Sequence, residues 1–132
     1  MAEVLHHAHD TPAAPGSCGY VRKMEEARKV FDSDPHVRAF FIGHSHIPAV
    51  FTEKGQEKPE YGRKYLFRDG RAIVNVGSVG QPRDKDPRAC YVIIDDEGYR
   101  FFRVEYDTEA AAKKIRAAGL DPLLADRLLK GT

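Results

Sequence analysis

Two histidines separated by a single residue stand at the end of an apolar segment near the middle of the chain. They are His44 and His46 in FFIGHSHIP, and Gly43 before them permits a sharp change of direction at the end of a strand. In an extended backbone, residues two apart project to the same side, so both imidazoles would face one site and Ser45 would point away from it. Imidazole binds several first-row metal ions. The spacing predicts a metal site, and the alternative is a coincidental pair in a chain with six histidines.

A second group of histidines lies near the N-terminus, in LHHAHDTP. His7 and His9 would share one face of a short strand and His6 the other, so at most two of the three could face one site. For His6 and His7 the residues favour a structural or solvated role, because a metal ligand needs convergent partners.

The segment NVGSVGQPRD, residues 75–84, follows another predicted strand and is a candidate anion site. Gly77 and Ser78 allow close approach of the backbone and offer N–H donors, and Arg83 carries a guanidinium group suited to phosphate. With Asn75 at the strand end, these are the candidate substrate-binding residues. The alternative is a glycine-containing turn that only changes the direction of the chain.

Hydrophobic periodicity predicts the elements that would position these residues. An apolar stripe of Tyr20, Met24, Ala27 and Phe31 predicts a helix over residues 20–31, and Thr108 and Asp121-Pro122 are placed to begin two more helices that end near Gly119 and Gly131. We expect strands over residues 3–9, 37–42 and 49–52, and an exposed excursion over 53–63. Two hairpins are expected, 64–67 with 72–76 and 90–94 with 100–104.

Length and composition bound the possible functions. The 132 residues are one domain in size, and 21 basic against 20 acidic side chains leave a net charge of +1, which gives no sign of nucleic-acid or membrane binding. Cys18 and Cys90 form no CxxC pair, which argues against a zinc ribbon or a secreted disulfide framework and favours the cytoplasm. There is no apolar run of membrane-spanning length and no secretory leader.

Four segments together resemble the calcineurin-like metallophosphoesterases, in particular their small bacterial members. GHSHIPAVF resembles their GHxH signature, NVGSVGQPRDKDPRACYVIID the segment that follows it, and YDTEAAAKKIRAAGLDPLLADRLLKG the end of those proteins. HDTPAAPGSCGYV resembles their H-x-[ST]-P-x-x-P loop, which makes His9 the match to a metal-ligating histidine. The resemblance covers nearly the whole chain. It implies a mixed α/β fold, part of a four-layer αββα sandwich in which two sheets face each other.

The resemblance also implies a reaction, the hydrolysis of phosphate mono- or diesters with two divalent ions, commonly manganese, iron or zinc. His9 and His44 would bind one ion and His46 the other, with Ser78 and Arg83 on the phosphate side. The family's DxH, GDxx and GNH[DE] motifs are absent from these residues. We therefore expect residues 1–132 to be a single domain that forms the C-terminal part of a metallophosphoesterase, and the histidine that often acts as the family's general acid belongs to the absent motifs.

Without the missing carboxylates the metal site would be incomplete. Neutral imidazoles do not offset the repulsion between two divalent ions about 3.5–4 Å apart, so this chain would hold no metal or one weakly bound ion. One alternative is a non-catalytic protein-binding module on the same scaffold, which would self-associate or recruit an N-terminal partner chain through an uncovered sheet. Another is a mononuclear zinc site made by His9, His44 and His46.

Overall fold

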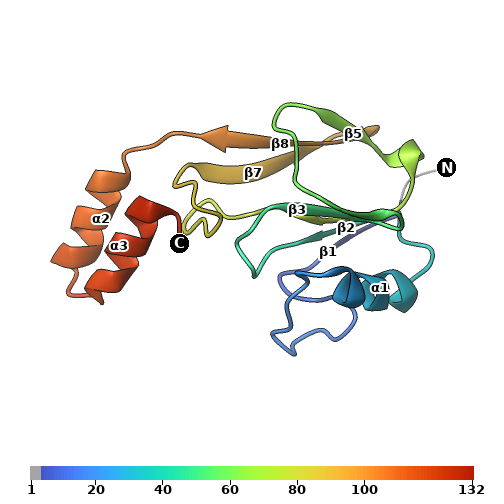
Figure 1. Ribbon diagram of the computed structural model, residues 1–132, viewed down its shortest axis with the longest axis horizontal. Coiled ribbons are helices and arrows are strands. Elements are labelled where there is room, and N and C mark those ends of the chain that lie inside the picture. The colour runs from blue at the N-terminus through green and yellow to red at the C-terminus, as the bar shows by residue number, and fades with distance from the viewer. Residues whose placement is uncertain (1–3) are drawn as a thin grey trace.

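The structure, a computed structural model, describes residues 4–132 and has three layers (Figure 1). Helix α1 (Met24–Ser33) covers one face of a five-stranded sheet, here called sheet A, whose other face packs against a three-stranded sheet, sheet B. Helices α2 (Thr108–Ala117) and α3 (Pro122–Lys130) form a hairpin beyond one end of the sheets. The strands are β1 (Leu5–His7), β2 (Ala39–Ile42), β3 (Ala49–Thr52), β4 (Gly55–Glu57), β5 (Lys64–Leu66), β6 (Ala72–Asn75), β7 (Ala89–Ile94) and β8 (Gly98–Val104).

Sheet A has the strand order β1-β2-β6-β3-β4 and is covered on both faces. Strands β1, β2 and β6 are parallel, whereas β3 runs antiparallel to β6 and β4. Along β2, Phe40 and Ile42 pack toward α1 and Phe41 packs toward sheet B, so apolar residues occupy every position. The continuous apolar pattern of this segment predicted such two-sided burial, and the structure confirms it. Residue 3 of the predicted first strand lies outside the described residues.

Sheet B is antiparallel, with the order β5-β8-β7, and aromatic side chains fill its inner face. The ring of Tyr99 stacks on Tyr65 at 5.2 Å and meets Phe41 of sheet A edge-on at 5.6 Å between ring centroids. Burial raises the pKa of the Tyr99 hydroxyl well above its usual range. The predicted hairpin of β7 and β8 is confirmed. Together with sheet A, this sheet establishes the predicted mixed α/β fold.

The other predicted hairpin is wrong. Strand β5 pairs with β8 in sheet B, whereas β6 pairs with β2 and β3 in sheet A. A short 3-10 helix (Phe67–Asp69) carries the chain from one sheet to the other. Tyr65 and Phe67 are buried between the two sheets. The stability gained by packing these rings against distant strands outweighs the preference of Asp69-Gly70 for a local hairpin turn. The predicted excursion over 53–63 is mostly exposed, and within it residues 55–57 form strand β4, which pairs with β3.

Two helices begin at different residues from those predicted. Helix α1 starts at Met24 rather than Tyr20, because the Glu26 carboxylate accepts hydrogen bonds from the backbone N–H of Lys23 at 2.6 Å and Arg22 at 3.4 Å. Asp107 caps α2 by accepting from the N–H of Ala110 at 2.8 Å. The third helix begins after Asp121 and ends at Gly131, as predicted.

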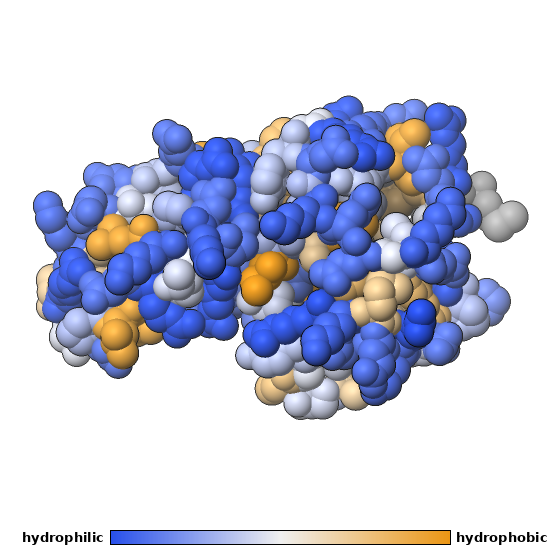
Figure 2. All heavy atoms as spheres, in the orientation of Figure 1, coloured by the Kyte–Doolittle hydropathy of each residue, from blue (hydrophilic) through white to orange (hydrophobic). Residues whose placement is uncertain are grey.

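The surface is mostly hydrophilic on the face that Figure 2 shows, with hydrophobic side chains gathered over the α2–α3 hairpin. The hairpin leaves Leu120, Leu123 and Leu124 exposed. No helix within residues 4–132 is both long enough and apolar enough to cross a membrane.

Candidate metal centre

His44 sits at the centre of a very tight turn that directly follows β2. The Ser45 N–H donates to the Gly43 carbonyl at 2.7 Å, and the φ of His44 is 64°, which together define a γ-turn with a positive central φ. Such turns are rare, and His46 is left-handed as well, with φ 59°. Each left-handed non-glycine residue stores about 1–3 kcal/mol of strain, and such residues cluster at functional sites. The expectation of an extended backbone from His44 to His46 is therefore wrong.

His9 lies directly beside His44. Strands β1 and β2 are parallel neighbours, so the loops that follow them leave the sheet at the same edge. The Gly43 N–H donates to the His9 carbonyl at 3.1 Å, which joins the two loops. The Nε2 atom of His9 and the Nδ1 atom of His44 are 3.1 Å apart. Two residues 35 positions apart in sequence thus present ring nitrogens to each other.

In each histidine of the GHSH segment, one ring nitrogen lies within hydrogen-bond distance of a backbone carbonyl oxygen. The Nε2 atom of His44 is 3.1 Å from the carbonyl oxygen of Cys18, and the Nδ1 atom of His46 is 2.8 Å from that of Gln81. A carbonyl only accepts hydrogen bonds, so each of these nitrogens carries a hydrogen. In a metal-ligating ring the lone pairs would then lie on Nδ1 of His44, which here accepts from His9 Nε2 at 3.1 Å, and on Nε2 of His46. This is the pattern in which metal-ligating histidines are held.

The geometry of His9 and His44 fits part of a ligand set. Nitrogen–metal distances of about 2.0–2.1 Å with ligand angles of about 90–110° place two nitrogens about 2.8–3.4 Å apart, and these two are 3.1 Å apart. Among residues 4–132, however, no three His, Cys, Asp or Glu side chains converge on one point. His46 does not join the pair, so the mononuclear three-histidine alternative is not formed. A complete site would need further ligands.

His6 and His7 lie away from this pair and pack against phenylalanines of β2. The His6 ring lies 5.6 Å from Phe40, and the His7 ring stacks on Phe41 at 5.2 Å. His6 is partly buried and His7 is exposed, which fits the structural or solvated role that the sequence favoured for them.

Asn75 has a different environment from the one expected of a substrate ligand. Its side chain is fully buried. Its Nδ2 donates to the Gly43 carbonyl and to Ser45 Oγ, each at 2.8 Å, and its Oδ1 accepts from the Gly77 N–H at 3.1 Å. Ser45 is also buried and points away from the histidine rings toward Asn75, as predicted. Asn75 therefore holds the GHSH segment and is not exposed to a ligand.

The other candidate substrate residues line a loop that is fastened to His46. Gly77 is buried with φ 79°, and a Cβ atom there would lie 2.8 Å from the Cys90 sulfur, so the position requires glycine. Ser78 Oγ accepts from the Gln81 N–H at 2.9 Å. The backbone N–H of Arg83 donates to the His46 carbonyl at 3.1 Å. The Arg83 guanidinium donates to Gln81 Oε1 at 2.6 Å. Ser78 and Arg83 are only partly buried, so both remain reachable from solvent.

Charged and buried groups anchor the end of this loop. The Arg103 side chain is 2% exposed and pairs with Asp84, with the Tyr61 hydroxyl at 3.0 Å and with the Arg88 carbonyl at 2.8 Å. The guanidinium of Arg88 holds the pKa of Asp86 down at about 2. Burial raises the pKa of the Cys90 thiol to about 11. The loop is thus fixed to sheet B independently of any ligand.

Two residues beside His44 were not recognised as part of the site from the sequence. Tyr20, which the sequence assigned to the apolar stripe of a helix, stacks on the His44 ring with 4.4 Å between ring centroids. The Arg22 guanidinium lies 4.0 Å from the centroid of the Tyr20 ring. Cys18 supplies the carbonyl to His44, and its own N–H donates to Asp10 Oδ2 at 3.0 Å. Only the nearby His-x-Thr-Pro pattern hinted that this loop belongs to the site.

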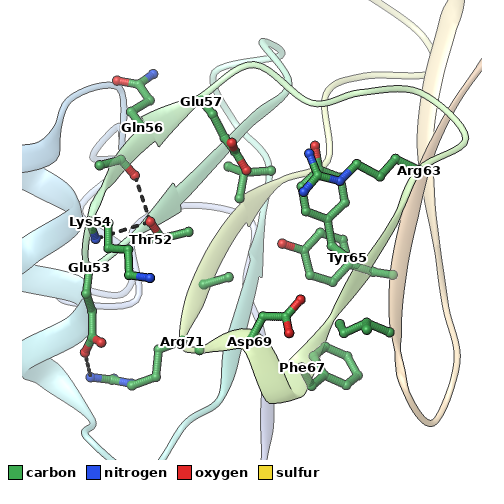
Figure 3. Close-up of a pocket in the computed structure, with 16 residues that line it drawn as sticks. Thr52, Glu53, Lys54, Gln56, Glu57, Arg63, Tyr65, Phe67, Asp69 and Arg71 are labelled. Carbon is green, nitrogen blue, oxygen red and sulfur yellow. Dashed lines mark hydrogen bonds and ion pairs between the residues drawn. The ribbon is translucent and has the colours of Figure 1, made fainter.

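The cavity shown in Figure 3 lies elsewhere in the molecule. It has a volume of about 410 Å³ and opens between the β3–β4 hairpin and β5. Arg71 pairs with Glu53 at 3.7 Å on one side, and the rings of Tyr65 and Phe67 lie on the other. None of the candidate metal or substrate residues lines it. The site that the histidines form is therefore a surface arrangement at the strand ends and not this cavity.

Comparison with known proteins identifies the family. A family model for the calcineurin-like phosphoesterase superfamily domain matches residues 3–98. An uncharacterised protein of Methanocaldococcus jannaschii is 43% identical over 93 residues, which cover 69% of this chain and 38% of that protein. The crystal structure of a metallophosphoesterase from Sphaerobacter thermophilus superposes with a TM-score of 0.90 at 32% identity, covering 100% of this chain and 57% of that one.

A second solved structure shares the fold alone. It is a hypothetical protein from Pyrococcus horikoshii OT3, which superposes with a TM-score of 0.70 at 16% identity and covers 97% of this chain and 46% of that one. The chain thus spans less than two thirds of the length of each of these relatives. The family match extends over well more than half of the chain and includes the histidines described above. The chain belongs to the calcineurin-like phosphoesterase superfamily.

Proposed function

We propose that this chain supplies part of the site of a metal-dependent phosphoesterase that hydrolyses phosphate mono- or diesters. The observation that carries the proposal is the pair of ring nitrogens of His9 and His44, 3.1 Å apart at the ends of parallel strands. Membership of the superfamily supports phosphoester chemistry. The tautomer that the Cys18 carbonyl favours leaves the inner nitrogen of His44 free to bind a cation.

In this proposal His9 and His44 bind one divalent cation and His46 binds another, with manganese, iron and zinc as candidates. When bound, the cations would neutralise phosphoryl oxygens and activate water for in-line attack. The histidines would contribute only their ring lone pairs. Carboxylates from outside this sequence would complete the site, supplied by a preceding segment or a partner chain. Residues 1–132 would then be the C-terminal part of the domain.

The loop of residues 75–84 would face the phosphoryl group. The Arg83 guanidinium is held by Gln81, and Gln81 also accepts from His46, so the donors of Arg83 keep a fixed position relative to that histidine. A guanidinium suits phosphoryl oxygens because it offers two parallel N–H donors. Ser78 would add a hydroxyl beside it. Asn75 and Gly77 would act only by shaping the loop.

A protein-binding module is the second candidate, favoured by the outer face of sheet B. Within the described residues β7 has only β8 as a strand partner, and its outer edge beyond Cys90, whose N–H donates to the Ser78 carbonyl at 2.9 Å, could accept a strand. On this face Ile93 is 52% exposed and Val104 45% exposed, next to the stacked rings of Tyr91 and Phe102. The partner would be a second copy of the chain or a chain that carries the missing carboxylates.

We place the protein in the cytoplasm. Cys18 and Cys90 are both free thiols, and reduced cysteines are usual in the cytosol. The substrate would accordingly be a soluble phosphoester, either a small molecule or a phosphorylated macromolecule.

The activity is tested by the Mn²⁺-dependent hydrolysis of p-nitrophenyl phosphate and bis(p-nitrophenyl) phosphate. A protein that contains this chain together with the segment that supplies the missing carboxylates is compared with its His44→Ala variant and, as a matched control, with His36→Ala, which removes an exposed histidine that lies before β2. Turnover that depends on Mn²⁺ and His44 but not His36 would support the enzyme. Turnover equal in all three proteins would exclude these histidines from the reaction. The absence of turnover together with stable self-association would favour the protein-binding role.

A further inference from the structure

The end of β6 lies directly beneath the segment that carries His44 and His46. Strand β6 is flanked by β2 and β3, and Asn75 at its end is paired with Ile42 on one side and Ala49 on the other. Residues 43–48, which connect β2 to β3, must therefore cross over the end of β6. The side chain of Asn75 is the group that fills the space under this connection, and it is fully buried.

The Asn75 carboxamide bonds to both ends of the γ-turn. One Nδ2 hydrogen goes to the Gly43 carbonyl, which is also the acceptor of the turn's own hydrogen bond, and the other goes to Ser45 Oγ. Ser45 Oγ in addition accepts from the Ile47 N–H at 3.2 Å. Both donors of the amide and both acceptor positions of the hydroxyl are thereby used. A buried polar group so fully paired specifies one arrangement of the chain around it.

The turn needs such support because its backbone is strained. His44 and His46 both have positive φ, and neither is a glycine. Without the amide, the Gly43 carbonyl and the Ser45 hydroxyl would each lose a buried partner. The segment would then relax toward ordinary φ values and carry the His44 ring away from His9.

We infer that Asn75 and Ser45 are positioning residues, which hold the strained γ-turn so that the free nitrogen of His44 faces that of His9. The inference deepens the proposed function and rests on it as far as metal binding is concerned. Its geometric part, the orientation of the His44 ring, applies to the chain without any ligand. Neither residue would contact metal or substrate.

The test uses Co²⁺ alone as the probe, titrated into the 132-residue chain and followed by visible absorption. Asn75→Asp is nearly isosteric, but it places a carboxylate oxygen where the amide donates to the Gly43 carbonyl and Ser45 Oγ. Ser45→Ala removes one of these two acceptors with little change in volume. Loss of a partner that orients a ligand usually lowers metal affinity by about 10–100-fold, which is the expected loss for both variants. Phe101→Leu, in the core of sheet B, serves as the control for general destabilisation.

The orientation is read separately in the metal-free chain at constant pH, from the ¹H–¹⁵N spectrum of the imidazole rings. We expect Asn75→Asp and Ser45→Ala to change the His44 signals, whereas Phe101→Leu leaves them as in the wild type. Wild-type spectra and wild-type Co²⁺ affinity in both variants would overturn the inference. If the wild-type chain binds no Co²⁺ through these histidines, His9 and His44 do not hold a metal ion without the missing carboxylates, and the ring spectra alone then decide the positioning role. Should Asn75→Asp not fold, Ser45→Ala decides alone.

Discussion

The His44 ring is held on three sides, and only one of these contacts is to a candidate metal ligand. Its nitrogens face His9 and the Cys18 carbonyl, each at 3.1 Å, and Tyr20 stacks on its face at 4.4 Å. All three partners come from the loop between β1 and α1. The geometry of the histidine pair therefore depends on this loop as much as on the GHSH segment itself.

The two cysteines are expected to differ in reactivity toward a thiol reagent. Cys18 is exposed, whereas Cys90 is buried and its pKa is raised to about 11, so little thiolate forms there at pH 8. With Ellman's reagent at pH 8, one thiol per chain should react rapidly in the native protein and a second only after unfolding. Equal rates for both thiols in the native chain would contradict the burial of Cys90.

Asp86 is expected to stabilise the fold in a pH-dependent way. Arg88 lowers its pKa from 3.8 to about 2, so its contribution is complete above about pH 4 and is lost as the pH falls through 2. Because Arg88 is partly exposed, we expect Asp86→Asn to lower the free energy of unfolding by only about 1 kcal/mol at pH 7. Urea denaturation at pH 7 and at pH 3 measures the difference.

The difference between Asp86→Asn and the wild type should shrink at pH 3. Asp96→Asn, at an exposed carboxylate in the β7–β8 turn, is the control and should change stability little at either pH. A loss that stays constant between pH 7 and pH 3 would show that the carboxylate's charge is not the cause.

At the scale of elements, the loop after β6 offers a matched pair of glycines. Gly77 has φ 79° and a Cβ there would lie 2.8 Å from Cys90, whereas a Cβ at Gly80 would meet nothing within 4 Å. Gly77→Ala should therefore lower the free energy of unfolding by about 1–3 kcal/mol. Gly80→Ala should change it little. Thermal unfolding of both variants tests this, and equal stability would mean that Gly77 is not confined as described.

Sequence predicted best those elements whose determinants are adjacent in the chain. The β7–β8 hairpin and the helix between Asp121 and Gly131 are of this kind. Strand β5, in contrast, pairs with β8, whose residues begin more than thirty positions later, and no local pattern specifies that choice. The same limit applies to the site. Histidine spacing indicated metal chemistry, but the γ-turn at His44 depends on a buried amide from another strand.

At the scale of the whole molecule, no element within residues 4–132 covers the outer face of sheet B, whereas both faces of sheet A are covered. The α2–α3 hairpin lies beyond the end of the sheets and does not cover that face (Figure 1). Exposed apolar side chains beside a free strand edge favour association. The outer face of sheet B is therefore where the proposed association of this chain would be tested.

Self-association of the isolated chain is the expected consequence. Sedimentation velocity over a concentration series should show dimers or larger species, and Ile93→Lys should shift the population toward monomer by placing a charge on the outer face of β7. Leu123→Lys, on the exposed side of α3, is the control for the other apolar patch. A monodisperse wild-type monomer at all concentrations would contradict this assignment of sheet B.

The most direct test of the account is the amount of Zn²⁺ bound per chain, measured by equilibrium dialysis and elemental analysis. The wild type is compared with His9→Ala, His44→Ala and the control His36→Ala. We predict that the wild type and His36→Ala bind one ion weakly, and that His9→Ala and His44→Ala lose this binding to the same extent. Equal Zn²⁺ binding by all four proteins would contradict the claim that His9 and His44 share a metal ion.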